Sequence, residues 1–159
     1  MPIISYNNFK AITYASAWCG RLDNACGLYL QGANGSDCAH FISHCLDAGG
    51  ITIPNTDPAT NFCPQGLAVR NTLLVPALRN LAMLYDNVVE IGLVDAIIGD
   101  VGFLDILLPT HAFMIFEPFN LASPLVAPKV YAHSNSRCGE RLDTNWRQWF
   151  TTMFRLTDA

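Results

Sequence analysis

Residues 35–50 constrain the fold more than any other stretch, because local signals bound a helix at both of its ends. A Gly-Ser-Asp sequence supplies a residue that can cap the N-terminus, and a Gly-Gly pair is a strong C-terminal stop. We therefore predict a helix over residues 38–48, with Cys38 in its first turn. There, unpaired backbone N–H groups and the positive end of the helix dipole stabilise a thiolate. This position makes Cys38 a candidate nucleophile, whereas a buried structural cysteine is the simpler alternative.

The same helix carries two histidines at the spacing that zinc-binding helices use, His40 and His44. At 3.6 residues per turn they lie on the face opposite Cys38 and Cys45, so a base for Cys38 must come from elsewhere. The glutamate of the H-E-x-x-H motif is missing, and the sequence offers no obvious third ligand. We interpret this face as solvated and polar, and we expect no metal and no cofactor.

The composition indicates one domain over residues 1–159. Hydrophobic residues make up 51% of the chain, which suits one sizeable core. A formal net charge of -4 with only 14% charged residues offers no basic surface, so we expect no nucleic-acid partner. Apolar runs stay short of a membrane span, and no signal peptide is visible. We expect a soluble protein, cytoplasmic or exported by a route that the sequence does not reveal.

Six cysteines leave the redox compartment open. A free Cys38 would leave at most two disulfides and one spare thiol, and the spacing indicates neither a disulfide framework nor a zinc ribbon.

Helical signals dominate the first half of the chain. The spacing of Phe9, Ile12, Ala15 and Trp18 predicts an amphipathic helix over residues 5–18. Residues 19–35 are typical of a surface loop, from which Tyr29 could reach the site. Three prolines make residues 51–66 an irregular segment beside a cleft, and a further helix is predicted over residues 75–86, with Pro76 at its start.

Strand signals follow in the second half, as short β-branched or aromatic runs separated by Gly, Pro or Asn. They cover residues 88–91, 101–106, 112–116, 130–133 and 152–156. Helices first and strands later predict an α+β fold, with the helices packed on one face of an antiparallel sheet.

Two histidines lie at the ends of predicted strands, His111 and His133. Histidines on neighbouring strands can supply a general base for a thiol and a second group that orients it. By alternation His133 shares its strand face with Tyr131, and His111 could present its imidazole on the same side. We expect Cys38 and His111 at the rim of a cleft, although a histidine on a strand is more often an ordinary core or surface residue.

Taken together, these residues resemble the NlpC/P60-like cysteine hydrolases, and most closely the group usually called the putative amidase domain. The resemblance covers most of the chain. It rests on residues 6–15, on the Gly-Ser-Asp-Cys-Ala-His-Phe-Ile-Ser-His-Cys-Leu-Asp-Ala-Gly-Gly sequence of residues 35–50, on the Gly-Asp-Val of residues 99–101, on His111 and on the Ala-His-Ser of residues 132–134. His40 and His44 stand where that group usually has Asn and Gln.

The resemblance implies a papain-like fold in which Cys38 attacks an amide carbonyl, His111 is the base and His133 is the third polar residue. Asn135 competes with His133 for that third position, and Asp37 or Tyr29 could serve as the third residue or support the oxyanion. The implied substrate is a peptide amide, of the kind found in bacterial cell-wall stem peptides. An inhibitory protein partner is not identifiable from the sequence.

A catalytically inactive module that binds a peptide or a protein on the same fold is the alternative. A binding module needs neither Cys38 nor His111, and both are present. We therefore expect an enzyme, a cysteine peptidase or amidase, rather than this inactive module.

Overall fold

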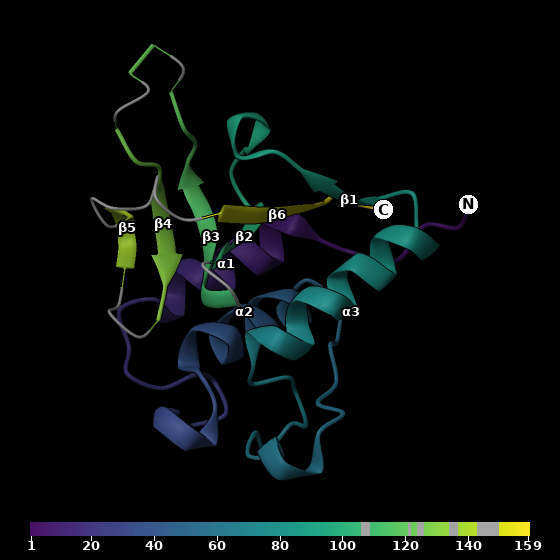
Figure 1. Ribbon diagram of the computed structural model, residues 1–159, viewed down its shortest axis with the longest axis vertical. Coiled ribbons are helices and arrows are strands. Elements are labelled where there is room, and N and C mark those ends of the chain that lie inside the picture. Colours follow the sequence, from purple (N-terminus) through teal and green to yellow (C-terminus); the bar gives the residue numbers. More distant parts are fainter. Residues whose placement is uncertain (106–108, 121, 124–125, 134–136, 143–149) are drawn as a thin grey trace.

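Helices precede strands along the chain, and the helices cover one face of the sheet (Figure 1). The computed structural model describes residues 1–105, 109–120, 122–123, 126–133, 137–142 and 150–159. Within them lie three α-helices: α1 (Asn8–Trp18), α2 (Asp37–Ala48) and α3 (Asn71–Leu84). The predicted α+β class, with an antiparallel sheet, is confirmed.

The described strands form one antiparallel sheet in the order β1-β6-β2-β3-β4-β5. Their bounds are β1 (Val88–Ile91), β2 (Val101–Asp105), β3 (Pro109–Glu117), β4 (Lys129–Ala132), β5 (Arg137–Arg141) and β6 (Phe150–Leu156). All five predicted strands are present. Strand β5 is not among the predicted strands, because its polar residues lie at the sheet edge and lack the apolar alternation that marks a half-buried strand.

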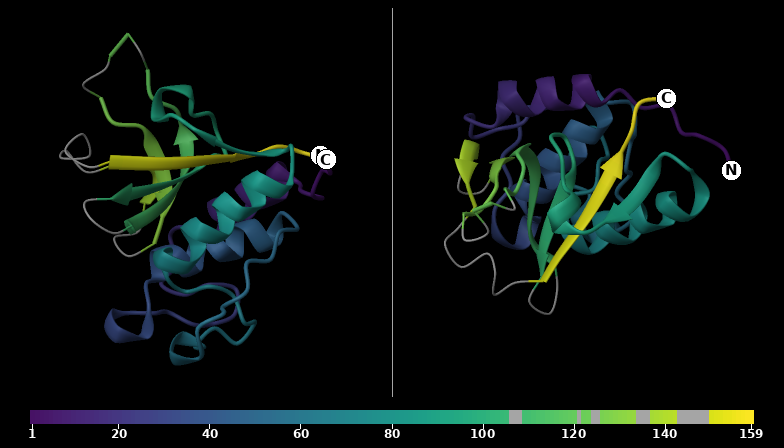
Figure 2. Two further views of the ribbon diagram at one scale, coloured as in Figure 1. Left: turned by 45° about the vertical axis from the view of Figure 1, so that its right-hand side comes forward. Right: turned by 90° about the horizontal axis from the view of Figure 1, so that it is seen from above.

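Alternation along the strands builds a core on each face of the sheet. Phe103 and Met114 belong to the buried cluster shared with the three helices, whereas Phe113 and Ile115 belong to a second cluster on the opposite face. Figure 2 shows the helices gathered on one side of the sheet. Helix α2 packs against α1, α3 and strands β3 and β4, so its N-terminus is held from several sides.

Local signals account for α2. The helix ends at Ala48, as predicted, and begins at Asp37, one residue before the predicted start. Gly50, after the Gly49 cap, has a φ of 106°, a conformation that glycine adopts without strain. The side chain of Ser36 makes no capping hydrogen bond to the helix backbone. Its hydroxyl is therefore available for another contact.

The other two helices depart from prediction in detail. In α1, Asn7 caps the N-terminus, and Ala15 of the predicted apolar face is buried together with Ala11, but Phe9 of that face is 75% exposed. Small residues there allow α1 and α2 to pack closely. Helix α3 begins at Asn71, so Pro76 lies inside the helix, where its missing N–H removes one backbone hydrogen bond.

The loops on either side of α2 lie away from the sheet (Figure 1). They contain the short 3-10 helices η1 (Gly32–Asn34) and η2 (Pro58–Thr60), and a third, η3 (Leu93–Asp95), follows β1. The prediction that residues 19–35 form only a surface loop is wrong, because Asn24 and Leu30 are buried. No helix among the described residues is long and apolar enough to cross a bilayer.

Candidate functional site

Cys38 lies in the first turn of α2, as predicted, with its sulfur between two polar side chains. Ser36 Oγ lies 2.6 Å from Cys38 Sγ, and Asn71 Nδ2 donates to the same sulfur over 3.6 Å. Asn71 is the first residue of α3, so the contact joins the starts of two helices. Cys38 is only 1% exposed, so the expectation that it lies at the rim of a cleft is wrong. No local motif in the sequence marks Asn71 as a site residue.

An open pocket of about 310 Å³ adjoins the N-terminus of α2. Ser36 and Asp37 line it together with Tyr29 and Gly35. Tyr29 is partly exposed, and its hydroxyl accepts a hydrogen bond from Gln31 Nε2 over 3.2 Å. Tyr29 therefore lies beside the predicted site, at the wall of this pocket.

The side chain of Asp37 is buried in the protein rather than exposed to solvent in this pocket, and three side chains lie within hydrogen-bond distance of its carboxylate. His133 Nδ1 lies 2.5 Å from Oδ2, His40 Nδ1 lies 3.2 Å from Oδ1, and Asn24 Nδ2 donates to Oδ1 over 2.9 Å. Burial raises the pKa of Asp37, but the hydrogen bonds from His133 and His40 outweigh it and hold the pKa below its ordinary value. Asp37 is therefore a buried carboxylate that positions histidines.

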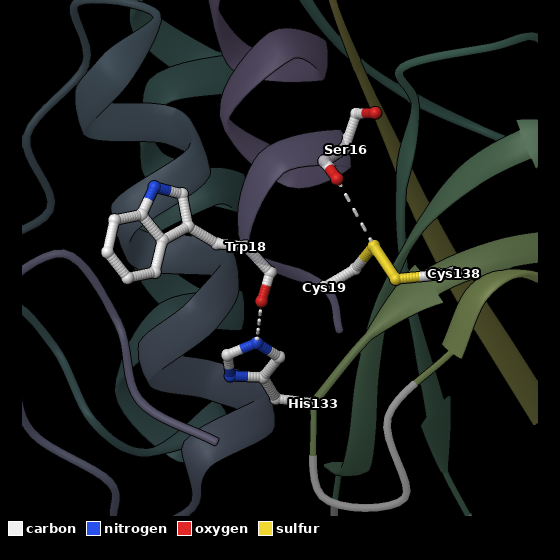
Figure 3. The surroundings of a disulfide bond; sticks show 5 residues. All are labelled: Ser16, Trp18, Cys19, His133 and Cys138. Atoms are coloured by element: carbon white, nitrogen blue, oxygen red, sulfur yellow. Dashed lines mark hydrogen bonds between the residues drawn. A yellow bond between two sulfur atoms is a disulfide. The ribbon is translucent and has the colours of Figure 1, made fainter. Parts of the chain in front are cut away.

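His133 directly follows β4 and uses both ring nitrogens. Nδ1 faces Asp37, and Nε2 lies 2.6 Å from the backbone oxygen of Trp18, a bond that Figure 3 shows beside a disulfide. The ring also stacks on Phe41, with 4.2 Å between centroids. Because a carboxylate and a carbonyl both accept, the two bonds together require a proton on each nitrogen. His133 is thus held in place on both sides.

His111 lies in β3, half-buried, and pairs with Leu104 of β2. Leu104 belongs to the buried cluster on the sheet face away from the helices, together with Phe113. By this register, His111 lies on the sheet face opposite His133. The expectation that the two imidazoles share one side of the sheet is therefore wrong. Among the contacts between described residues, none joins Cys38 to His111. Asn135, the other predicted candidate, lies outside the described residues.

The disulfide in Figure 3 joins Cys19, at the end of α1, to Cys138 in β5. It fixes the end of α1 next to the Trp18 carbonyl that accepts from His133. The sequence does not reveal this pair, because 119 residues separate the two cysteines. The described free cysteines are Cys26, Cys38, Cys45 and Cys63.

His40 and His44 are 0% and 3% exposed, so the predicted solvated face is wrong. Both rings point to two cysteines that belong to the loops on either side of α2, Cys26 and Cys63. The ligand atoms of these four residues all lie within 4.8 Å of one another. Burial raises the pKa of Cys63, but hydrogen bonds from His40 and His44 lower it to about 5.

Comparison with known proteins gives one family match. The model of the family described as the putative amidase domain matches residues 5–70, less than half of the 159-residue chain. The match spans α1, α2 and the loops between them and α3, and it includes Cys38 but neither His111 nor His133. A search of curated proteins finds no match. These findings support an amidase-like domain, a class that hydrolyses amide bonds.

Proposed function

We propose that this protein hydrolyses peptide amide bonds with Cys38 as its nucleophile. The observation that carries the proposal is the position of Cys38 Sγ at the N-terminus of α2, 2.6 Å from Ser36 Oγ, inside the segment that matches an amidase family. Backbone N–H groups at a helix start stabilise both a thiolate and the oxyanion that forms when it attacks a carbonyl. The fold that we propose for residues 1–159 is a single papain-like domain of the NlpC/P60 kind.

Asn71 supports a peptide as substrate. Its Nδ2 donates to Cys38 Sγ, whereas its Oδ1 is buried and has no hydrogen-bond partner among the described residues. A buried unpaired acceptor is costly, and a substrate N–H beside the nucleophile would satisfy it. We assign Asn71 to substrate positioning.

His111 is the base in this proposal, as the resemblance to the cysteine hydrolases implies. His133 already holds Asp37 and Trp18, and His40 and His44 face Cys26 and Cys63. The register of β2 and β3 shifts between Leu104 and Asp105, next to His111. Such irregularities re-aim side chains beside active sites, and the dyad requires this strand end to turn toward α2. His133 then acts on the site through Asp37 rather than through His111.

The reaction proceeds in two steps. Cys38 gives its proton to His111 and attacks the carbonyl, and His111 then protonates the leaving amine as the C–N bond breaks. Water attacks the resulting thioester while His111 takes its proton. As the C–S bond breaks, His111 returns this proton to Cys38 Sγ, so that the carboxylic acid is released and the free thiol of Cys38 is regenerated. By resemblance, the substrate class is a short peptide amide such as a bacterial cell-wall stem peptide.

The test is turnover of purified cell-wall fragments, followed by mass spectrometry of the new amine and carboxylate. We expect cleavage by the wild type, none by Cys38→Ala or His111→Ala, and retained cleavage by the folded fraction of Cys45→Ala. Cys45 is buried in the same helix, and burial raises its pKa well above the ordinary value, so it is the matched inert thiol. Unaltered turnover by Cys38→Ala would refute the proposal. Binding of fragments without cleavage by the wild type would favour an inactive module.

A further inference from the structure

The geometry points to a tetrahedral zinc site formed by Cys26, His40, His44 and Cys63. This site is separate from the proposed hydrolysis, and the inference does not rest on it. Two cysteine sulfurs and two imidazole nitrogens are a ligand set that favours zinc. All four side chains supply one ligand atom each within a sphere that a single ion can reach.

The distances between ligand atoms fit one central ion. His40 Nε2 lies 3.0 Å from His44 Nε2 and 3.2 Å from Cys63 Sγ. It lies 3.6 Å from Cys26 Sγ, and Cys63 Sγ lies 3.8 Å from His44 Nε2. Tetrahedral zinc, with bonds of about 2.0–2.1 Å to nitrogen and 2.3 Å to sulfur, separates two nitrogens by about 3.3 Å and nitrogen from sulfur by about 3.6 Å. The nitrogen–sulfur contacts lie between 3.2 and 3.8 Å, on both sides of their value, and the nitrogen–nitrogen contact is slightly shorter than its value.

The fold prepares the four ligands from three segments. One turn of α2 separates His40 from His44, Cys26 lies in the loop before the helix, and Cys63 follows η2 in the loop after it. The two loops have little regular structure of their own, and both lie beside α2 away from the sheet (Figure 1). An ion bound here would fasten both loops to the helix that carries Cys38.

A second layer of contacts orients the histidines. With Nε2 bound to the ion, the proton of His40 lies on Nδ1, which faces Asp37 Oδ1 at 3.2 Å. This carboxylate–histidine arrangement is the usual support of a zinc ligand. The ring of His44 stacks on Tyr14, with 5.9 Å between centroids. Four protein ligands leave no open position, so the site is structural rather than catalytic.

Binding requires no oxidant or reductant. The divalent ion displaces the protons carried by the four ligands, which pass to solvent, so that both cysteines bind as thiolates and both imidazoles bind as neutral groups through their lone pairs. The competing fate of these two thiols is oxidation to a Cys26–Cys63 disulfide, which would release two electrons and abolish the ligand set.

The direct test is the metal content of wild-type protein purified without chelators, measured by inductively coupled plasma mass spectrometry. We expect about one zinc per chain. Replacement by Co²⁺ should give the intense visible bands of a tetrahedral ion and a thiolate charge-transfer band. A folded wild-type chain that contains no zinc, takes up neither Zn²⁺ nor Co²⁺, or has a Cys26–Cys63 disulfide would overturn the inference.

Variants locate the ion. Cys63→Ser should lose the zinc and the cobalt spectrum, whereas Cys45→Ser, which alters another buried thiol of α2, should keep both. Cys38→Ala should also keep the zinc, so that loss of activity and loss of metal are separable results. Chelation should lower the melting temperature of the wild type but not that of Cys63→Ser. Full zinc content in Cys63→Ser would place the ion elsewhere and refute the site.

Discussion

Asp37 Oδ2 lies 2.5 Å from His133 Nδ1, although 96 residues separate the two in the chain. The other oxygen of the same carboxylate faces His40 on α2. One buried carboxylate thus joins the segment after β4 to the helix of the proposed nucleophile. It also links the disulfide end of α1, through Trp18 and His133, to the cluster of cysteines and histidines.

Asp37→Asn should be among the most destabilising single changes in the chain. An amide keeps the shape but removes the negative charge, which leaves the His133 imidazolium without its partner. Breaking a buried pair in this way costs about 3–5 kcal/mol in the free energy of unfolding, measurable by urea denaturation. Asp47→Asn is the control: this carboxylate lies at the exposed end of α2 and accepts from Thr52 Oγ1, which an amide oxygen can also do. Equal stability of the two variants would show that Asp37 and His133 are not a buried ion pair.

Gly35→Ala should distort the entry to α2. Gly35 has a φ of 118°, and a Cβ there would lie 2.9 Å from the carbonyl oxygen of Val69. Backbone strain and the clash together should lower the free energy of unfolding by about 1–3 kcal/mol. Gly32→Ala is the matched control in the same loop, because its φ is 64° and nothing lies within 4 Å of the added atom. The melting temperatures of both variants check this, and a smaller loss for Gly35→Ala would contradict the close packing against Val69.

Removal of the disulfide by Cys19→Ala with Cys138→Ala should lower the free energy of unfolding by about 2–4 kcal/mol, because the bond closes a long loop in the unfolded chain. Denaturant unfolding of the double variant against the wild type measures the loss. Cys45→Ala, which deletes a buried thiol outside any bridge, is expected to lose only about 1 kcal/mol. A double variant with wild-type stability would argue that the two cysteines are not bonded in solution.

Ser36, just before α2, and Ser43, in the middle of α2, should behave in opposite ways. Ser36→Ala removes the hydroxyl beside Cys38 Sγ but no helix cap, so turnover and alkylation of Cys38 should fall while stability changes by less than about 0.5 kcal/mol. Ser43→Ala removes a buried hydroxyl that donates to Ala68 O over 2.7 Å. It should cost about 1–3 kcal/mol and leave the turnover of the folded fraction intact. Turnover and denaturation measurements on both variants test this prediction. A reversed pattern would show that Ser36 is not part of the site.

The elements that the sequence predicted well are those with local signals. Helix α2 has a cap residue at one end and a Gly-Gly pair at the other, and the apolar strands are recognisable from their β-branched and aromatic residues. Helix α3 was placed too late because Pro76 was assumed to lie at a helix start, and tertiary packing of Leu74 and Val75 carries the helix through it. Strand β5 has no apolar signal, because it pairs at an edge and forms the anchor of a disulfide.

The residues of the two sites come together through tertiary contacts, which their spacing in the sequence does not reveal. The His40-x-x-x-His44 spacing was visible, but Cys26 and Cys63 come from irregular loops at variable distances, so nothing local identifies them as partners. For Asp37 the sequence predicts a helix cap, a third residue of the site or an oxyanion support, but it does not predict the contact with His133, which lies 96 residues away in the chain. For the same reason, the sequence alone does not determine on which face of the sheet His111 lies, because this depends on its pairing with Leu104.

The Cys19–Cys138 bond makes residues 19–138 a covalent ring, and every residue proposed for either site lies on it. Its members include Cys26, Cys38, His40, His44, Cys63, His111 and His133. One backbone cut within the ring would therefore leave both halves of each site tethered to each other. Such a nicked molecule would migrate as one species until a reductant separated its fragments.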